Sequence, residues 1–338
     1  MKRSIAIGAV LACAVAVLAA TASAGKVPSG SSTGTATVFW PNPVASLQDQ
    51  TLTDQKDADY AALQPAYRNV TVTNLDGSGF LVGDWAQVVS ETGDPAYSAT
   101  NTFTYHRSDD RFEQVMAYYW ITEAQKYIQS LGFGTGKYPP VNMQSQRVRI
   151  NQLGYDNSFA TDHPVDELRF GKGGVDDAED AEVILHEYGH AIHFSQGFAF
   201  ASEEAGAISE GFGDYWAVDV TNVIAPTPDA PCVADWDSTS YTRTVPHCLR
   251  RVDGSLHYPG DLSGEVHHDG QIWSRALWDI RGALGHAEAD TIILNGQFGF
   301  DGTTMTDLAQ RTVAAAQQLY GNAAAKSVQK AFADRGIL

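Results

Sequence analysis

The feature of this sequence that most constrains its fold is the run His186-Glu187-Tyr188-Gly189-His190, in which two histidines stand four positions apart. Residues 181–193 have helical propensity and periodicity, and the acidic stretch before them suits a helix N-terminus. On a helix, residues four apart are only about 40° apart around the axis, so both imidazoles face the same way. The run therefore predicts a helix that presents two metal ligands to one point, with Glu187 beside them.

A third ligand is found further along the chain. Glu210 follows within a second predicted helix, at 205–220. A catalytic zinc ion takes three protein ligands and keeps one position open for water, and a carboxylate on a following helix completes such a set. We therefore expect one catalytic Zn²⁺ at His186, His190 and Glu210, with Glu187 as the catalytic base.

The residues that follow Glu210 fit a helix at a metal site. Asp214 comes one turn later and faces the same direction, so we expect it to accept the remaining ring N–H of a zinc-bound histidine and to fix that ring. Gly211 and Gly213 each weaken a helix by about 1 kcal/mol relative to alanine. Such glycines are easier to accept where two elements must approach closely.

The start of the chain has the pattern of a secretory leader. Met1-Lys2-Arg3 precedes an apolar run that ends at Leu18, and Ala22-Ser23-Ala24 is the small-residue pattern that signal peptidase cleaves after. A transmembrane anchor is the alternative, but the apolar run is short for one. We expect residues 1–24 to be a signal peptide and the mature protein to be secreted or periplasmic, with no stable membrane insertion.

The cysteines fit an oxidising compartment. Cys13 belongs to the predicted leader, which leaves Cys232 and Cys248 in a loop-rich segment. Two remaining cysteines in an exported protein favour a disulfide, and neither lies near the metal motif.

The net charge limits the partners. It is −18 for the 338-residue chain, and losing Lys2 and Arg3 with the leader makes it −20. A chain this acidic is not expected to bind nucleic acid. Acidity favours solubility outside the cell, and calcium binding by clustered carboxylates is an alternative role for it. The carboxylates that would serve calcium form the densest acidic run: Asp176, Asp177, Glu179 and Asp180.

Periodicity and turn residues give a coarse secondary structure. Residues 25–66 are rich in Ser, Thr, Gly, Pro and Asp and are expected to be irregular or edge structure, whereas 70–89 resembles a β-hairpin. Strand-like pieces occupy 148–170. The expected helices are 111–131, 181–193, 205–220, 270–284, and further helix from 305 to the end.

Two segments carry a resemblance to a known family. The run 178–184 and the block 209–214 resemble the fungalysin group of gluzincin zinc metallopeptidases, which is related to thermolysin, and matching pieces span about 157–280. The resemblance implies an α+β, two-lobed thermolysin-like fold with a mixed β/α N-terminal lobe, a central HExxH helix and a mainly helical C-terminal lobe. We expect a β-rich lead-in at 25–95, the N-terminal catalytic lobe at 96–204 and the helical lobe at 205–338.

The same resemblance implies roles for other residues. His267 matches the histidine that donates a hydrogen bond to the oxyanion, and His268 is the second candidate. Asn157 and Ser158 match the edge segment on which such peptidases lay the substrate backbone. The tyrosine that thermolysin-like enzymes place between the second histidine and the glutamate ligand is absent, because 191–209 contains none. A preference for bulky apolar residues after the scissile bond is also implied.

Together these features predict a secreted zinc-dependent endopeptidase that uses zinc-activated water and a glutamate base on protein or peptide substrates. Two alternatives are a secreted zinc-binding adhesion or binding protein on a peptidase fold, and an exopeptidase. The sequence gives no indication of the oligomeric state.

Overall fold

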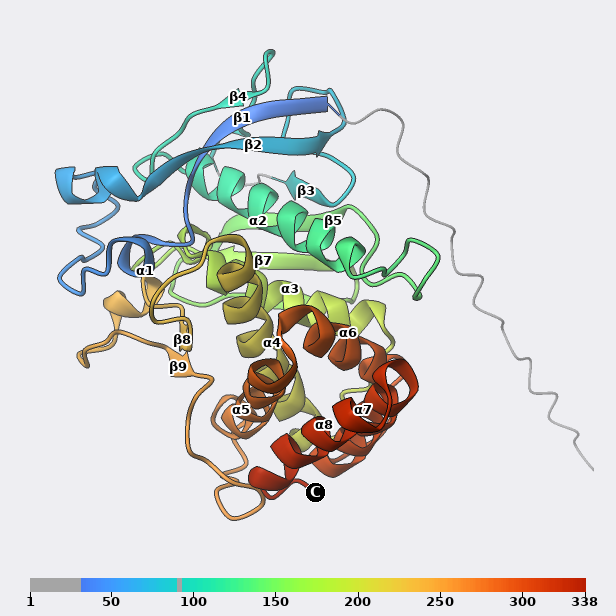
Figure 1. Ribbon diagram of the computed structural model, residues 1–338. Coiled ribbons are helices and arrows are strands. Elements are labelled where there is room, and N and C mark those ends of the chain that lie inside the picture. Colours follow the sequence, from blue (N-terminus) through green and yellow to red (C-terminus); the bar gives the residue numbers. More distant parts are fainter. Residues whose placement is uncertain (1–31, 90–92) are drawn as a thin grey trace, which may run out of the picture.

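The structure is a computed structural model that describes residues 32–89 and 93–338 (Figure 1). The predicted signal peptide and its cleavage point lie outside the described residues. Along the described ranges, every helix is too short or too polar to cross a lipid bilayer.

The first sheet has the order β2-β1-β4. Strand β1 (Ser32–Phe39) pairs antiparallel with β2 (Tyr67–Leu75) and parallel with β4 (Thr102–Phe103). The expectation of irregular or edge structure for 25–66 is wrong here, since β1 is the central strand and its second half is buried. Helix α1 (Pro43–Leu47) and the 3₁₀ turn η1 (Ala61–Ala66) follow.

The second sheet has the order β3-β5-β7-β6. Strands β3 (Ala86–Val89), β5 (Gln146–Leu153) and β7 (Glu167–Gly171) are parallel, and β6 (Phe159–Thr161) is an antiparallel edge strand beside β7. The predicted hairpin at 70–89 is wrong, because β2 and β3 belong to different sheets and only isolated bridges join this segment to itself. Alternating residues mark a strand, but they do not identify its partner.

Helix α2 (Arg111–Ser130) connects the two sheets. It packs against β1 on one side and against β3 and β5 on the other, and Figure 1 shows it between the sheets. The helix can contact both sheets because aromatic and aliphatic side chains are buried around most of its circumference.

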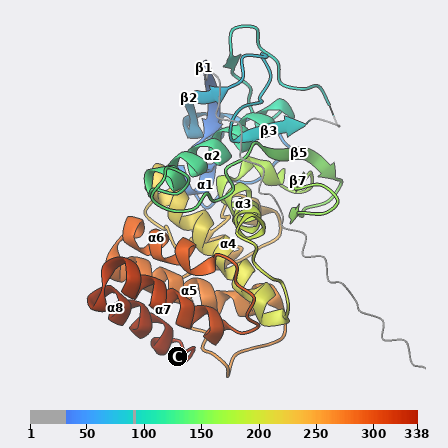
Figure 2. The same cartoon turned by 90° about the vertical axis from the view of Figure 1, so that its right-hand side faces the viewer.

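The remainder is helical. Helices α3 (Ala181–Ser195) and α4 (Glu203–Ile224) lie between the sheets and the last helices, as Figure 2 shows from the side. The last helices are α5 (Val266–Leu284), α6 (His286–Gln297), α7 (Met305–Tyr320) and α8 (Asn322–Asp334). Helix α6 was not expected from the sequence.

One continuous hydrophobic core runs from Ala36 in β1 to Ile337 near the C-terminus, so the sheets and the helices pack as one body. The predicted α+β class is confirmed, with mixed sheets first, the helix of residues 186–190 in the middle and a helical C-terminal part.

Candidate metal centre

Helices α3 and α4 begin at capping side chains that fix their entry points. The Asp180 carboxylate accepts from the Glu182 backbone N–H at 2.9 Å, and the Ser202 hydroxyl accepts from that of Ala205 at 3.0 Å. The helices cross at two glycines, because a Cβ added to Gly189 would lie 3.0 Å from the Gly213 Cα. The glycine at 213 therefore lets the backbones approach closely enough for side chains of both helices to meet.

Three potential ligands converge at this crossing. Glu210 Oε2 lies 3.2 Å from His186 Nε2, and Glu210 Oε1 lies 3.6 Å from His190 Nε2. Ligand atoms about 2.0–2.1 Å from a tetrahedral zinc ion are about 3.3 Å apart. The spacing and the two-nitrogen, one-oxygen donor set therefore fit a zinc ion.

The second nitrogen of each histidine has its own partner. His186 Nδ1 lies 3.0 Å from Asp214 Oδ1, and His190 Nδ1 lies 2.8 Å from the Ser209 hydroxyl. Partners at Nδ1 leave each Nε2 available for a metal and hold both rings in place. Sequence reasoning missed Ser209, although it directly precedes Glu210.

Asp214 is itself held by a salt bridge from a distant strand. Arg250 in β9 (Arg250–Arg251) donates from Nε and Nη2 to the two Asp214 oxygens, both at 2.7 Å. Sequence reasoning also missed Arg250, because nothing in the local pattern connects it to a residue 36 positions earlier.

A disulfide closes the loop that carries this arginine. Cys232 and Cys248 are bonded, with their Cα atoms 5.4 Å apart, which confirms the predicted pairing. Strand β8 (Cys232–Val233) pairs antiparallel with β9, so the disulfide lies close to the segment that positions Arg250.

Burial sets the protonation behaviour of Glu187. Burial raises the pKa of Glu187 to about 7, and the charge of His186 opposes that rise. Its Oε2 is buried without a hydrogen-bond partner among the described residues. Glu187 is thus a carboxylate able to exchange a proton near neutral pH, with an oxygen not committed to the protein.

The neighbouring residues Asp214, His190 and His186 respond differently to burial. Burial raises the pKa of Asp214, but the charge of Arg250 outweighs it and brings the pKa down to about 2. Burial lowers the pKa of His190 to about 4. Burial also lowers that of His186, but hydrogen bonds to Asp214 and Glu210 raise its pKa to about 10. A metal at His186 therefore competes with a proton.

His193, one turn beyond His190, is a packing residue. Its ring stacks between Phe198 and Phe212, with centroid separations of 4.2 and 4.6 Å. Its Nδ1 lies 2.9 Å from the Ser209 hydroxyl.

His267, at the start of α5, faces the metal ligands. Its Nε2 lies 3.4 Å from Glu210 Oε2 and its Nδ1 lies 2.6 Å from Glu265, while half of the side chain is exposed. His268 instead contacts Asp269 at 3.0 Å. Of the two candidates, His267 is the one that lines the adjoining cavity.

That cavity has a volume of about 420 Å³ and opens beside Glu187. Asn157 and Ser158, which directly precede the edge strand β6, form part of its wall. One carboxylate of the acidic run, Asp177, also lines it, and the Ser158 hydroxyl donates to that carboxylate.

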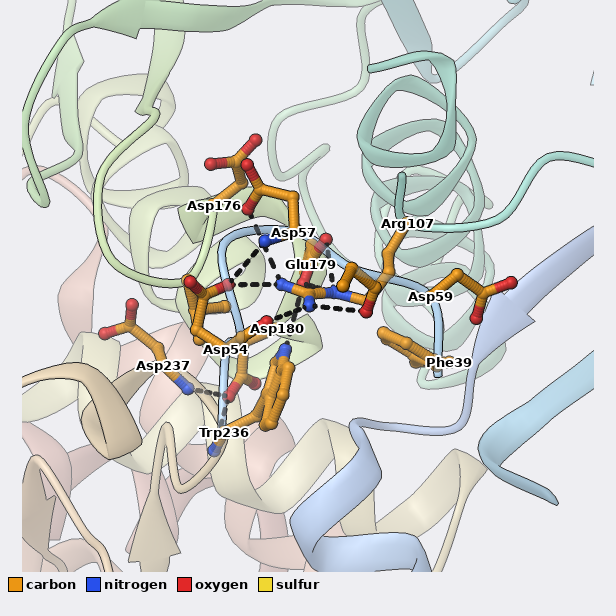
Figure 3. A network of polar contacts seen from close by, with 12 residues as sticks. Phe39, Asp54, Asp57, Asp59, Arg107, Asp176, Glu179, Asp180, Trp236 and Asp237 are labelled. Atoms are coloured by element: carbon orange, nitrogen blue, oxygen red, sulfur yellow. Dashed lines mark hydrogen bonds and ion pairs between the residues drawn. The ribbon is translucent and has the colours of Figure 1, made fainter. Parts of the chain in front are cut away.

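The other carboxylates of the acidic run make contacts that stabilise the fold, and Figure 3 shows their network. The buried Arg107 donates to Glu179 at 2.9 Å and to Asp54 at 2.6 Å, while the Trp236 indole donates to Glu179 at 3.0 Å. Asp180 accepts from the backbone of Trp236. The network ties the N-terminal segment to the start of α3.

The four predicted calcium ligands therefore do not converge. Among the described residues that could hold a metal, only Asp177 of the four is grouped with other ligands, namely Asp156 and Asp237. Asp176 lies 3.7 Å from Lys172 instead.

The comparisons with known proteins agree with this arrangement. The model of the family described as fungalysin metallopeptidase (M36) matches residues 76–292. A solved structure, the precursor of protealysin, a metalloproteinase from Serratia proteamaculans, is similar in fold, with a TM-score of 0.58 and 17% identity. The similarity covers 75% of this chain and 88% of that chain. No curated protein matches.

Proposed function

The chain belongs to the fungalysin family of metallopeptidases, and from this premise we propose that it is a secreted zinc-dependent endopeptidase acting on proteins or peptides. The observation that carries the proposal is the convergence of His186, His190 and Glu210 beside the buried, uncommitted carboxylate of Glu187.

We propose that His186, His190 and Glu210 hold the metal. A zinc ion there would supply Lewis acidity, lowering the pKa of water and polarising the scissile carbonyl. Asp214 and Ser209 orient the two histidine ligands, since each contacts the Nδ1 atom of one imidazole. Arg250 in turn keeps Asp214 ionised and oriented.

Glu187 is the proposed base. It takes a proton from the attacking water and passes it to the departing amine, which a carboxylate with a pKa of about 7 can do in both directions. His267 donates from Nε2 to the oxyanion that develops on the carbonyl. Its half-exposed ring can reach substrate, and Glu265 holds Nδ1.

The substrate backbone is proposed to add to the edge strand β6. Within the described residues this strand pairs with β7 alone, and Asn157 and Ser158 lie where β6 meets the cavity. An edge strand offers unpaired backbone groups to an extended peptide.

Secretion and the division into lobes are also proposals. The Cys232–Cys248 disulfide supports an oxidising compartment. We also propose the division into a lead-in at 25–95, a catalytic lobe at 96–204 and a helical lobe at 205–338.

Hydrolysis of a quenched fluorogenic casein tests the proposal. The purified chain should cleave it, lose activity with a zinc chelator and regain it when zinc is restored. One bound zinc per chain without hydrolysis would instead support a binding or adhesion protein. Mass spectrometry of a peptide digest separates the other alternative, because an exopeptidase produces a ladder from one terminus and an endopeptidase produces internal cuts.

A further inference from the structure

The wall of the cavity beside Glu187 contains three aspartates from separate segments. Oxygen atoms of Asp156, Asp177 and Asp237 all lie within 4.8 Å of one another, and all three residues line the cavity. Asp177 and Asp237 are 2% and 4% exposed, whereas Asp156 is half-buried. Three anionic groups at such distances repel one another strongly where water is excluded.

Two oxygens of this acidic cluster are uncommitted. Asp177 Oδ2 accepts from Ser158, and Asp237 Oδ2 accepts from the Tyr241 hydroxyl at 2.8 Å. The Oδ1 atom of each aspartate is buried without a hydrogen-bond partner within the described part of the chain. Buried carboxylate oxygens without partners are costly, so a cation entering the cavity would gain their full interaction.

No basic side chain of the described residues forms an ion pair with the cluster. Arg250 lines the same cavity, but its guanidinium is paired with Asp214. Arg107, which is also buried, is paired with Asp54 and Glu179. Figure 3 shows Asp237 joined to that network through its backbone nitrogen, with its carboxylate turned away from Arg107. Burial accordingly raises the pKa of Asp177 to about 7 and that of Asp156 to about 6.

The rest of the cavity wall includes apolar residues. Val183, Val233, Ala234 and Leu249 line the space together with the cluster. A cavity lined by both apolar residues and carboxylates matches a lysine or arginine side chain, whose methylene stem is apolar and whose tip is charged. The volume of about 420 Å³ is also much more than a single ion needs.

The residues that line the cavity indicate on which side of the scissile bond it lies. His186 and Glu187 line the cavity, whereas His190 is not among its lining residues. In the proposed reaction Glu187 protonates the leaving amine, so the cavity is on the side of the residue that supplies this amine. We propose that the cavity is the subsite for the residue that follows the scissile bond, and that Asp156, Asp177 and Asp237 select lysine or arginine there.

This inference rests on the proposed peptidase function and replaces the apolar preference that the family resemblance implies. A divalent cation is the competing occupant. Calcium takes six to eight oxygen ligands, so three carboxylates would have to be supplemented by several further groups. We therefore favour the basic side chain and treat calcium as an outcome of the test.

The test uses quenched peptides that differ only in the residue after the cleavage point, with lysine, arginine, norleucine or glutamate there. Norleucine matches the stem of lysine without the charge. With the zinc-loaded full chain, kcat/KM for lysine and arginine should exceed that for norleucine by about tenfold to a hundredfold, as for a charged hydrogen bond. Mass spectrometry of the products confirms the position of cleavage.

Two variants connect the preference to the cluster. Asp237→Asn and Asp156→Asn should each lower the lysine-to-norleucine ratio by on the order of tenfold. Asp156 is half-buried, so its variant tests the proposal even where Asp237→Asn fails to fold. Asp301→Asn is the matched control, because that carboxylate is 94% exposed and is not part of the cavity wall.

The outcomes are separable. Cleavage of the norleucine peptide at an equal or higher rate would overturn the subsite while leaving the peptidase intact. Cleavage of no peptide by the zinc-loaded chain would overturn both. A basic preference of the zinc-loaded chain in calcium-free buffer that survives the addition of millimolar calcium chloride supports the subsite. Stoichiometric calcium binding abolished by Asp156→Asn, with no basic preference, would assign the cluster to calcium instead.

Discussion

Gly213→Ala tests whether the close crossing of α3 and α4 positions the metal ligands. A Cβ at this position would lie 2.9 Å from both Cε1 and Nδ1 of His186 and 3.2 Å from Cγ. Ordinary contacts begin at 3.4 Å, so the ring or the helix must move by at least the difference, 0.5 Å. The new methyl group therefore presses on the ring that Asp214 now holds at 3.0 Å.

Two opposing effects decide the stability of metal-free Gly213→Ala. In a helix interior alanine raises the free energy of unfolding by about 1 kcal/mol relative to glycine. Overpacking costs about 1–3 kcal/mol, so the net change in the free energy of unfolding should be a loss of about 0–2 kcal/mol. Displacing a metal ligand from its supporting partner lowers zinc affinity by about 10–100-fold. In excess zinc this adds a further loss of about 1.4–2.8 kcal/mol.

The assay is urea unfolding with chelator and with excess zinc, combined with a zinc titration against a competing chelator. Gly282→Ala in α5 is the matched control, because it is exposed and a Cβ there would meet nothing within 4 Å. It should gain up to about 1 kcal/mol and keep wild-type zinc affinity. A stabilised Gly213→Ala with wild-type zinc affinity would refute the reasoning.

Three further predictions concern the metal centre and the stability of the fold. Asp214→Asn should weaken zinc binding by about 10–100-fold in a chelator competition, since it removes the anion that holds the ring of His186. For Glu167, burial raises the pKa, but hydrogen bonds from Arg147, Arg169 and Arg149 outweigh it and hold the pKa below its ordinary 4.5. Its contribution to stability is therefore full above about pH 4.5 and is lost as the pH falls through the lowered pKa. The difference in unfolding free energy between wild type and Glu167→Gln should be about 1–3 kcal/mol at pH 7 and should shrink below pH 4; a constant difference would contradict this. Replacing Cys232 and Cys248 by serine opens a link between residues 16 apart and should cost about 3 kcal/mol in the same assay, whereas an unchanged midpoint would contradict it.

Local patterns predicted the helices around the site. The periodicity at 111–131, 181–193 and 205–220 corresponds to α2, α3 and α4, because each helix buries one side or most of its surface. The spacing of His186 and His190 is a property of the helix itself and needs no tertiary information.

Local sequence patterns could not predict the contacts between distant segments. The threonines, Val38 and Phe39 of β1 suit a strand, but its central position follows from pairing with β2 and β4, which the local sequence does not specify. Arg250 contacts Asp214 across 36 positions, and Asp237 lies beside Asp177 across 60 positions. The acidic run 176–180 is contiguous, yet its side chains diverge to Lys172, the cavity, Arg107 and the cap of α3.

The most direct test of the central claim is zinc content together with peptide hydrolysis in Glu187→Gln, which keeps the shape of the side chain but removes the proton acceptor. The account predicts one zinc ion per chain, as in the wild type, with casein hydrolysis reduced by at least about 10²–10⁴-fold. Normal hydrolysis by this variant, with zinc bound, would contradict the assignment of Glu187 as the base and with it the proposed mechanism.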